Sequence, residues 1–166
     1  MPIYLFRHGE AHAVGERGIE SDAERPLTPK GKELTQAVCH GLRALGVECD
    51  EIWHSPLVRA KQTAEIVRRE FGLRKMVEQD GLAYLTEAEH LFLSLADIPS
   101  DKNLFLVGHQ PQLGDWVVRL VSNARGGNVA LSKSGVARID LLRSPAGPPR
   151  GELKWMLNAK ILRRLA

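Results

Sequence analysis

The sequence predicts an α/β fold. Short apolar runs, which we expect to be strands, alternate along the chain with longer segments in which apolar residues recur at helical spacing. One expected strand, residues 103–107, is apolar at every position from Leu104 to Val107, which is typical of a strand buried on both faces of a sheet. Neither an all-helical nor an all-strand protein would have this alternation.

The limits of the expected elements follow from start and stop signals. Thr28-Pro29 and Ser55-Pro56 each combine an N-cap residue with a proline suited to the first helical position. Gly46 and Gly72 end the two helices that begin there. We expect an extended surface loop at 11–26, strands at 2–6, 51–54, 75–78, 103–107, 135–142 and 152–157, and helices at 29–45, 56–71, 86–96 and after Pro111.

Length and composition indicate a single domain over residues 1–166. Apolar residues make up 43% of the chain and charged residues 26%, which is ordinary for a soluble globular protein. No stretch approaches the roughly 20 continuous apolar residues of a membrane span. The first residues carry no basic leader, so we expect a cytoplasmic protein with no membrane partner.

Charge and cysteine content argue against nucleic acid, metal and cofactor. The net charge is +3, but the basic residues are dispersed and aromatic residues make up only 5% of the chain. Cys39 and Cys49 form neither a disulfide framework nor a paired metal motif. His8 and His12 have the spacing of a zinc-binding helix, but Gly9 follows His8 and a strand precedes it. We expect no metal, no cofactor and no nucleic-acid partner.

Three of the expected strands run directly into a polar cluster. In open α/β sheets, ligands bind beyond the carboxyl ends of the strands, so residues far apart in sequence meet in one crevice. We therefore expect the three clusters to face each other. They are Arg7-His8-Gly9, Ser55-Pro56-Leu57-Val58-Arg59 and Gly108-His109-Gln110-Pro111.

Side chains of these types would form a pocket for a tetrahedral dianion. Arg7 and Arg59 match phosphate oxygens with two guanidinium forks, and the helix start near Pro56 would add backbone N–H groups. His8 is a nucleophile toward phosphorus when one ring nitrogen is deprotonated. His109, if protonated, would donate a hydrogen bond to the same oxygens. The two arginines would stabilise the charge as it redistributes, so the pattern predicts phosphoryl transfer to His8.

Three sequence motifs, at residues 7–10, 55–64 and 108–109, resemble in type and order those of the histidine phosphatase superfamily, the phosphoglycerate-mutase-like proteins. The resemblance extends from the first to the fourth expected strand and implies a phosphoglycerate-mutase-like, three-layer α/β/α sandwich with a mostly parallel central sheet. It also implies that His8 accepts the phosphate and that Arg7, Arg59 and His109 bind the phosphoryl group. The motifs are Arg7-His8-Gly9-Glu10, residues 55–64 (SPLVRAKQTA) and Gly108-His109.

Within the superfamily, the chain is most similar to the small SixA-like phosphohistidine phosphatases. The similarity lies in the shortness of the chain and in Arg25-Pro26-Leu27-Thr28, which is followed by Gly31. It implies that Arg25 reaches the phosphate or a neighbouring group of the substrate. A salt bridge that anchors the loop is an equal alternative for Arg25.

A general acid is the least defined part of the expected site. Larger members of the superfamily carry one, usually a glutamate, in a segment that corresponds to residues 80–87. Glu87 and Glu89 are the candidates, but both fall at an expected helix start, where acidic residues complement the helix dipole. Cleavage of an alkyl P–O bond needs a proton donor. A phosphohistidine expels imidazole, which has a pKa of about 6.5 and can leave already protonated, so a missing acid favours P–N substrates.

The expected function is therefore a phosphatase with a phosphohistidine intermediate, acting on phosphohistidine in a protein. Once the core elements are placed, no insertion remains to form a lid, and an open pocket suits a side chain presented by another protein. One alternative is a phosphatase for a small phosphate ester, such as a sugar or nucleotide phosphate. The other is a non-catalytic module that binds phosphorylated proteins, which the presence of all four pocket residues disfavours.

Overall fold

A mixed β-sheet forms the centre of the protein in the computed structural model, which describes residues 1–83, 91, 94–95, 98–122, 124, 127–142 and 149–166. Within these residues the sheet has six strands in the order β3-β2-β4-β1-β5-β6. Strands β1 to β4 run parallel to one another, whereas β5 pairs antiparallel with β1 and with β6. The strands are β1 Pro2–Arg7, β2 Glu51–His54, β3 Val77–Glu78, β4 Leu104–Gly108, β5 Val136–Leu142 and β6 Arg150–Leu157.

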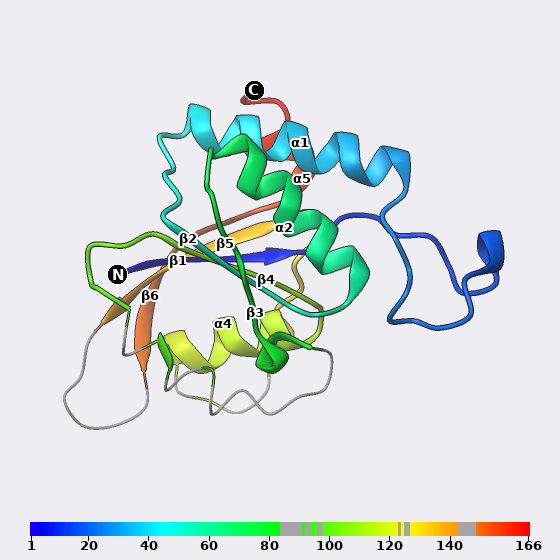
Figure 1. Cartoon of the computed structure of the whole chain (residues 1–166). Coiled ribbons are helices and arrows are strands. Elements are labelled where there is room, and N and C mark those ends of the chain that lie inside the picture. Colours follow the sequence, from blue (N-terminus) through cyan, green and yellow to red (C-terminus); the bar gives the residue numbers. More distant parts are fainter. Residues whose placement is uncertain (84–90, 92–93, 96–97, 123, 125–126, 143–148) are drawn as a thin grey trace.

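Helices cover both faces of this sheet (Figure 1). Helices α1 (Pro29–Ala44), α2 (Val58–Glu70) and the short α5 (Ala159–Leu162) lie on one face, and α4 (Gln112–Ser122) lies on the other. This arrangement confirms the predicted three-layer α/β/α sandwich with a mostly parallel sheet. None of the described helices is both long enough and apolar enough to cross a membrane.

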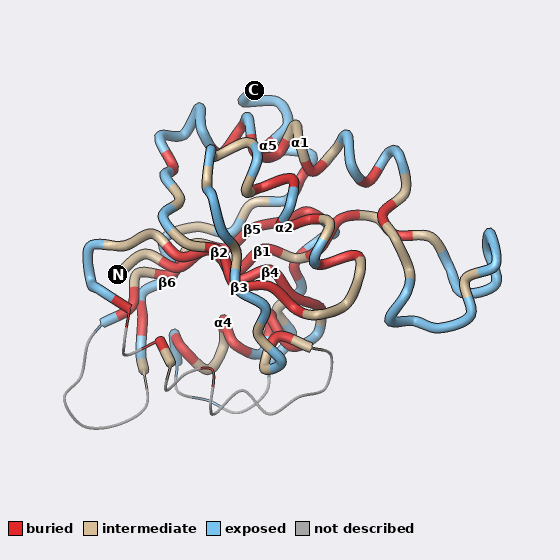
Figure 2. The backbone as a smooth tube through the Cα atoms, viewed as in Figure 1, coloured by how far each residue is buried: buried red, intermediate tan, exposed pale blue. Residues whose placement is uncertain are grey.

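The residues of β1 show how one strand supplies both layers of the core. Ile3 and Leu5 point into the cluster that α4 covers, and Tyr4 and Phe6 point into the cluster beneath α1 and α2. All four are at most 2% exposed. Figure 2 shows the buried residues of β1 and β4 at the centre of the molecule. For β4 the apolar run within residues 103–107 predicts this burial. The two central strands are thus fixed by packing on both sides, and so are the loops that leave them.

Two helix-start signals had different outcomes. Thr28 caps α1 as predicted, because its side-chain oxygen accepts a hydrogen bond from the Gly31 N–H at 2.9 Å. The second helix begins at Val58 and not at Pro56, since the backbone remains extended at Leu57. Ser55 does not cap it in the predicted way. Its Oγ accepts a hydrogen bond from the Leu57 N–H at 3.2 Å and also lies 2.8 Å from Nε2 of His109.

The remaining elements largely match the sequence patterns. The third strand is shorter than predicted, being limited to Val77–Glu78, and α5 has no counterpart among the predicted elements. The loop at 11–26 contains a short 3-10 turn at Glu16–Gly18 and is mostly exposed (Figure 2). The helix predicted at 86–96 lies largely outside the described residues.

Gly31 marks a very close approach between α1 and the chain segment after β1. A Cβ atom at this position would lie 2.1 Å from the carbonyl oxygen of Glu10. The same carbonyl accepts a hydrogen bond from the Thr28 N–H at 2.9 Å. Only glycine allows this contact, so it ties the start of α1 to the backbone that follows His8.

Replacing Gly31 with alanine should therefore destabilise the fold. We expect Gly31→Ala to lower the free energy of unfolding by about 2–3 kcal/mol, the range seen for overpacking against a fixed backbone. Urea unfolding followed by circular dichroism measures this change. Lys32→Ala, at the exposed neighbouring position, is the control and should stay within about 0.5 kcal/mol of wild type. Equal stability of the two variants would show that α1 moves away without cost.

Candidate active site

The carboxyl ends of β1, β2 and β4 meet at one edge of the sheet. Arg7 pairs with Gly108 across β1 and β4, and His54 pairs with Val107 across β2 and β4. The loops that follow these strands enclose a pocket of about 300 Å³. The structure thus brings the predicted residues Arg7, His8, Arg25, Arg59 and His109 together, and it adds three that were not predicted. The lining residues are Arg7, His8, Asp22, Arg25, Arg59, His109, Gln110 and Lys133.

His8 is held as a neutral imidazole with one defined tautomer. Its Nδ1 lies 2.7 Å from the carbonyl oxygen of Gly9, which can only accept, so Nδ1 carries the proton. The unprotonated Nε2 accepts a hydrogen bond from Nε of Arg59 at 3.2 Å. Burial, followed by the nearby charges of His109, Arg59 and Arg7, lowers the pKa of His8 to about 3. His8 therefore keeps a lone pair on Nε2 throughout the neutral range.

The backbone around His8 is fixed from two sides. The Gly9 N–H donates to Oγ1 of Thr63 at 3.1 Å, and this hydroxyl donates to the Arg59 carbonyl at 2.7 Å. From the other side, the Ser134 N–H lies 3.1 Å from the Arg7 carbonyl and 3.2 Å from the His8 carbonyl. Ser134 adopts a left-handed conformation, with φ of 55°, to make this contact. These contacts connect α2 and the start of β5 to the carbonyl that sets the His8 tautomer.

Arg59 and Arg7 bring two guanidinium groups to the pocket in different states. Arg59 donates to His8 through Nε, to the Asp22 carbonyl through Nη1 at 2.6 Å and to the Asp22 carboxylate through Nη2 at 2.9 Å. Arg7 donates to the Leu131 carbonyl through Nη1 at 2.7 Å, and its buried Nε has no partner among the described residues. Burial lowers the pKa of Arg7, as expected for a cation with little compensation.

His109 lies beside His8, with 5.0 Å between the ring centres. Its Nε2 is 2.8 Å from Oγ of Ser55, and its buried Nδ1 has no hydrogen-bond partner among the described residues. Burial, followed by the charges of Arg59 and Arg7, lowers the pKa of His109 to about 4. The imidazole is therefore neutral in this state, whereas the sequence predicts that its protonated form would donate to a bound phosphate. An anion in the pocket would raise this pKa again.

The start of α2 differs from the prediction in its hydrogen bonding as well as its position. The Val58 N–H, in the first turn, donates to the Ala23 carbonyl at 3.1 Å and is not free for an anion. The predicted contribution from a helix start at Pro56 was therefore wrong in position. The reason is local. Leu57 has an extended backbone, so the helix begins at Val58. Arg59 then lies in the first turn, where its Nε donates to Nε2 of His8.

Arg25 lies in the pocket wall and also makes the anchoring contact that was its alternative role. Its Nη1 donates to the Asp22 carboxylate at 2.8 Å.

Asp22 and Lys133 were not predicted as site residues, because each lies in a polar loop segment with no motif around it. Gln110 follows His109 directly and was part of a predicted cluster, so its position gave a signal. The acid candidates Glu87 and Glu89 lie outside the described residues.

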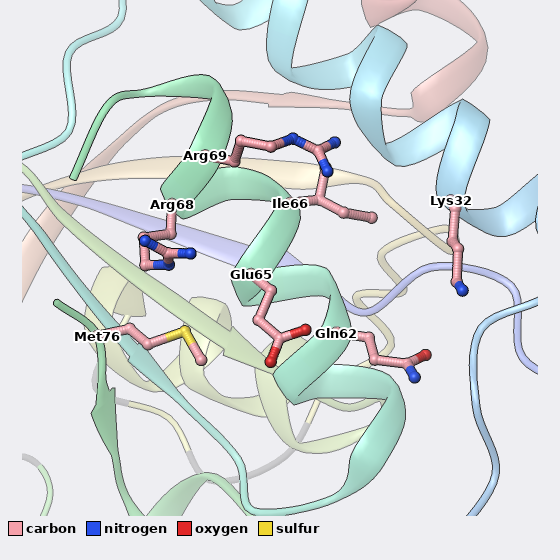
Figure 3. Close-up of a pocket in the computed structure, with 7 residues that line it drawn as sticks. All are labelled: Lys32, Gln62, Glu65, Ile66, Arg68, Arg69 and Met76. Carbon is pink, nitrogen blue, oxygen red and sulfur yellow. The ribbon is translucent and has the colours of Figure 1, made fainter. Parts of the chain in front are cut away.

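A second hollow, of about 440 Å³, lies along α1 and α2 (Figure 3). Its wall includes Lys32 of α1 together with Gln62, Arg68 and Arg69 of α2. Gln62 also accepts a hydrogen bond from the Leu27 N–H at 2.8 Å through its Oε1, which secures the end of the loop that carries Asp22. None of the residues that line this hollow is a histidine, serine or cysteine, so we place the chemistry in the first pocket.

The sequence profile of the histidine phosphatase superfamily (branch 1) matches residues 3–87. An uncharacterized protein of Picosynechococcus is 39% identical over 139 residues, which cover 82% of each chain. The chain belongs to the histidine phosphatase superfamily. This membership agrees with the resemblance stated from the three motifs, and the family profile covers two of them.

Solved structures of phosphatases share this fold. The protein histidine phosphatase SixA complexed with tungstate superimposes with a TM-score of 0.85 at 23% identity, covering 98% of this chain and 99% of SixA. A mutant of the phosphoserine phosphatase of Entamoeba histolytica, in complex with phosphoserine, gives 0.69 at 17% identity, covering 96% of this chain and 98% of that one. These identities establish a common fold, and the SixA match agrees with the predicted SixA-like architecture.

The depressed pKa values of the two histidines predict how stability depends on pH. A histidine buried in its neutral form binds a proton in the unfolded chain near pH 6.5 but in the folded protein only near its lowered pKa. Stability is therefore lost as pH falls below 6.5. For His109, with a pKa of about 4, the loss between pH 6.5 and 5 should be about 1.5 kcal/mol.

The variant His109→Gln should lack this part of the pH dependence while its amide can still donate to Ser55. Free energies of unfolding of variant and wild type at pH 6.5 and 5 measure the difference. Parallel pH profiles would contradict a lowered pKa at His109. Lys61→Gln, at an exposed site on α2, is the control and should follow the wild-type profile.

An anion in the pocket should bind together with a proton. Sulfate is a suitable probe because it does not titrate near neutral pH. Its charge raises the pKa of His109, so we expect its affinity to rise as pH falls from 7 to 5, by up to about tenfold per pH unit. Isothermal titration calorimetry in two buffers of different ionisation enthalpy should show proton uptake. Sulfate binding that is independent of both pH and buffer would contradict this coupling.

Proposed function

We propose that the chain is a phosphatase in which Nε2 of His8 attacks phosphorus and becomes transiently phosphorylated. The observation that carries this proposal is the tautomer of His8: the proton sits on Nδ1, toward Gly9, and the unprotonated Nε2 is directed to Nε of Arg59, which also lines the pocket. Membership of the histidine phosphatase superfamily supports phosphatase activity. A histidine that served only to bind phosphate would be expected to present a donor, and not a lone pair, to the anion.

The surrounding groups have roles that follow from their charge. Arg59 leaves Nε2 of His8 and turns its donors to the phosphoryl oxygens, while Arg7 offers its unpartnered Nε. His109 takes up a proton and donates from Nδ1 to the same oxygens. These fixed donors stabilise the charge of the transferring phosphoryl group. Water then hydrolyses the phosphohistidine and frees His8 for the next cycle.

We further propose that the physiological substrate is phosphohistidine in a protein. The pocket wall contains one described carboxylate, Asp22, and two arginines contact it, which lowers its pKa. A carboxylate in that state is a poor proton donor for an alkoxide leaving group, whereas an imidazole needs no donor at neutral pH. The fold shared with SixA, a protein histidine phosphatase, supports the same substrate class. A small phosphate ester remains the competing substrate class, because a phosphoserine phosphatase has this fold too.

Removing the nucleophile should abolish turnover. We expect His8→Ala to lower kcat for an aryl phosphate by at least about a thousandfold, in the range seen for loss of a nucleophile, and to abolish acid-labile labelling of the enzyme. The control His12→Ala changes a histidine of the neighbouring loop that does not line the pocket and should retain activity and labelling. Near-wild-type turnover by His8→Ala would overturn the mechanism.

The substrate class is decided by a direct comparison of kcat/KM values. A phosphohistidine-containing protein domain should be hydrolysed at least about tenfold more efficiently than phosphoserine, sugar phosphates and nucleotides, because only the first has a leaving group that needs no acid. Clear preference for one of the esters would replace phosphohistidine by that ester and leave the role of His8 intact. Binding of the phosphoprotein without any turnover would instead support the non-catalytic module.

A further inference from the structure

Asp22 occupies an unusual position at the mouth of the pocket. It belongs to the exposed loop between β1 and α1, which projects from the body of the protein in Figure 1. Its Oδ1 accepts from Nη1 of Arg25 at 2.8 Å, and its Oδ2 accepts from Nη2 of Arg59 at 2.9 Å. The side chain lines the pocket and is 54% exposed, so it is accessible to a group that enters the pocket.

Asp22 is also the one acidic residue that lines the pocket in the described parts of the chain. The hydrogen bond from Arg25 and then that from Arg59 lower the pKa of its carboxyl group. The group is therefore an anion at neutral pH. It can accept a hydrogen bond from a substrate, but it has no proton to give to a leaving group.

This charge affects the possible leaving groups in opposite ways. An ester substrate places a developing alkoxide or phenoxide near the mouth of the pocket, and a fixed carboxylate there repels it. A phosphorylated imidazole that is protonated on its second ring nitrogen presents an N–H with a positive charge. A carboxylate accepts a charge-assisted hydrogen bond from that N–H and raises the fraction of bound substrate that is protonated.

We propose that Asp22 is a specificity-determining residue that favours phosphohistidine over phosphate esters by accepting a hydrogen bond from the imidazolium N–H of the substrate. The proposal rests on the proposed function, since it assumes phosphoryl transfer to His8 in this pocket. Lys133, on the same pocket wall, is an exposed cation and cannot replace Asp22 in this contact.

The step is balanced without a general acid. The lone pair on Nε2 of His8 forms a bond to phosphorus as the P–N bond of the substrate breaks. The electron pair of that bond goes to the departing ring nitrogen. Because the other ring nitrogen already carries a proton, the product leaves as neutral imidazole. Asp22 keeps its hydrogen bond to that N–H throughout and neither gains nor loses a proton.

The contact with Arg59 offers a competing explanation, in which Asp22 only positions this arginine. The substitution Asp22→Asn separates the two roles. The amide oxygen can still accept from Arg59, and the backbone carbonyl of residue 22 still accepts from Nη1 of Arg59. The amide NH2 replaces the oxygen that accepts from Arg25, so the contact with Arg25 is lost. The contacts that position Arg59 are thus retained while the negative charge is removed.

The experiment compares wild type and Asp22→Asn on phosphoimidazole and on p-nitrophenyl phosphate. Both substrates would phosphorylate His8, and kcat/KM reports that first step. Loss of one charge-assisted contact should lower the ratio of the two kcat/KM values, phosphoimidazole over p-nitrophenyl phosphate, about tenfold, which corresponds to one pKa unit. The control Glu24→Gln removes an exposed charge from the same loop, outside the pocket, and should leave the ratio unchanged.

A pH profile gives a second readout that a positioning role would not change. The single-turnover rate with phosphoimidazole at saturating enzyme reports the protonation of bound substrate. In Asp22→Asn its decline with rising pH should begin about one pH unit lower, because the anion that favours the imidazolium is gone. The profile for p-nitrophenyl phosphate lacks this substrate ionisation and should not shift in this way.

The outcomes separate the inference from the function on which it rests. Equal changes in kcat/KM for both substrates, or no change for either, together with an unshifted pH profile, would overturn the role of Asp22 while the phosphatase stands. If wild type transfers phosphate to His8 from neither substrate, the proposed function fails and this inference fails with it. If Asp22→Asn does not fold, Asp22→Ser should give the same change of ratio.

Discussion

The hydrogen bond between Nδ1 of His8 and the Gly9 carbonyl is the contact on which the pocket depends. A backbone carbonyl can only accept, so this bond places the ring proton on the side away from the pocket and leaves Nε2 as a lone pair. The contact needs Gly9 at its observed place, and a Cβ at this position would lie 2.7 Å from Oγ1 of Thr35. Packing of α1 and α2 on the sheet thus fixes the chemistry of a single imidazole.

The electrostatics of the pocket follow from burying several cationic or basic groups together. His8, Arg59 and His109 are 7%, 4% and 1% exposed, and among the described residues that line the pocket only Asp22 supplies a negative charge. The folded protein responds by keeping both imidazoles neutral, which costs stability at low pH. The same groups are prepared for an anion, because a dianion supplies the charge that the pocket lacks. The groups that lower the stability of the folded protein at low pH are thus the groups that would bind phosphate.

Sequence patterns were sufficient for the sheet, the main helices and the convergence of three loops. Apolar runs buried on both faces of the sheet, the Thr28 cap and strands that end in polar residues are local signals with a direct physical meaning. The start of α2 was misplaced because Ser55-Pro56 has the composition of a helix start, whereas Ser55 contacts His109. Asp22 was missed because its position depends on two arginines, from its own loop and from α2, and no local pattern encodes such a contact.

The central claim is that His8 rests as the neutral Nδ1-protonated tautomer, so that Nε2 is unprotonated and can attack once Arg59 releases it. Nuclear magnetic resonance of the protein with ¹⁵N-labelled histidine side chains measures this directly, because each ring nitrogen reports its own protonation. The account predicts a protonated Nδ1 and an unprotonated Nε2 for His8 at every pH from 8 to 5, consistent with a pKa of about 3. A proton on Nε2 in place of Nδ1, or titration of the ring near pH 6.5, would contradict it.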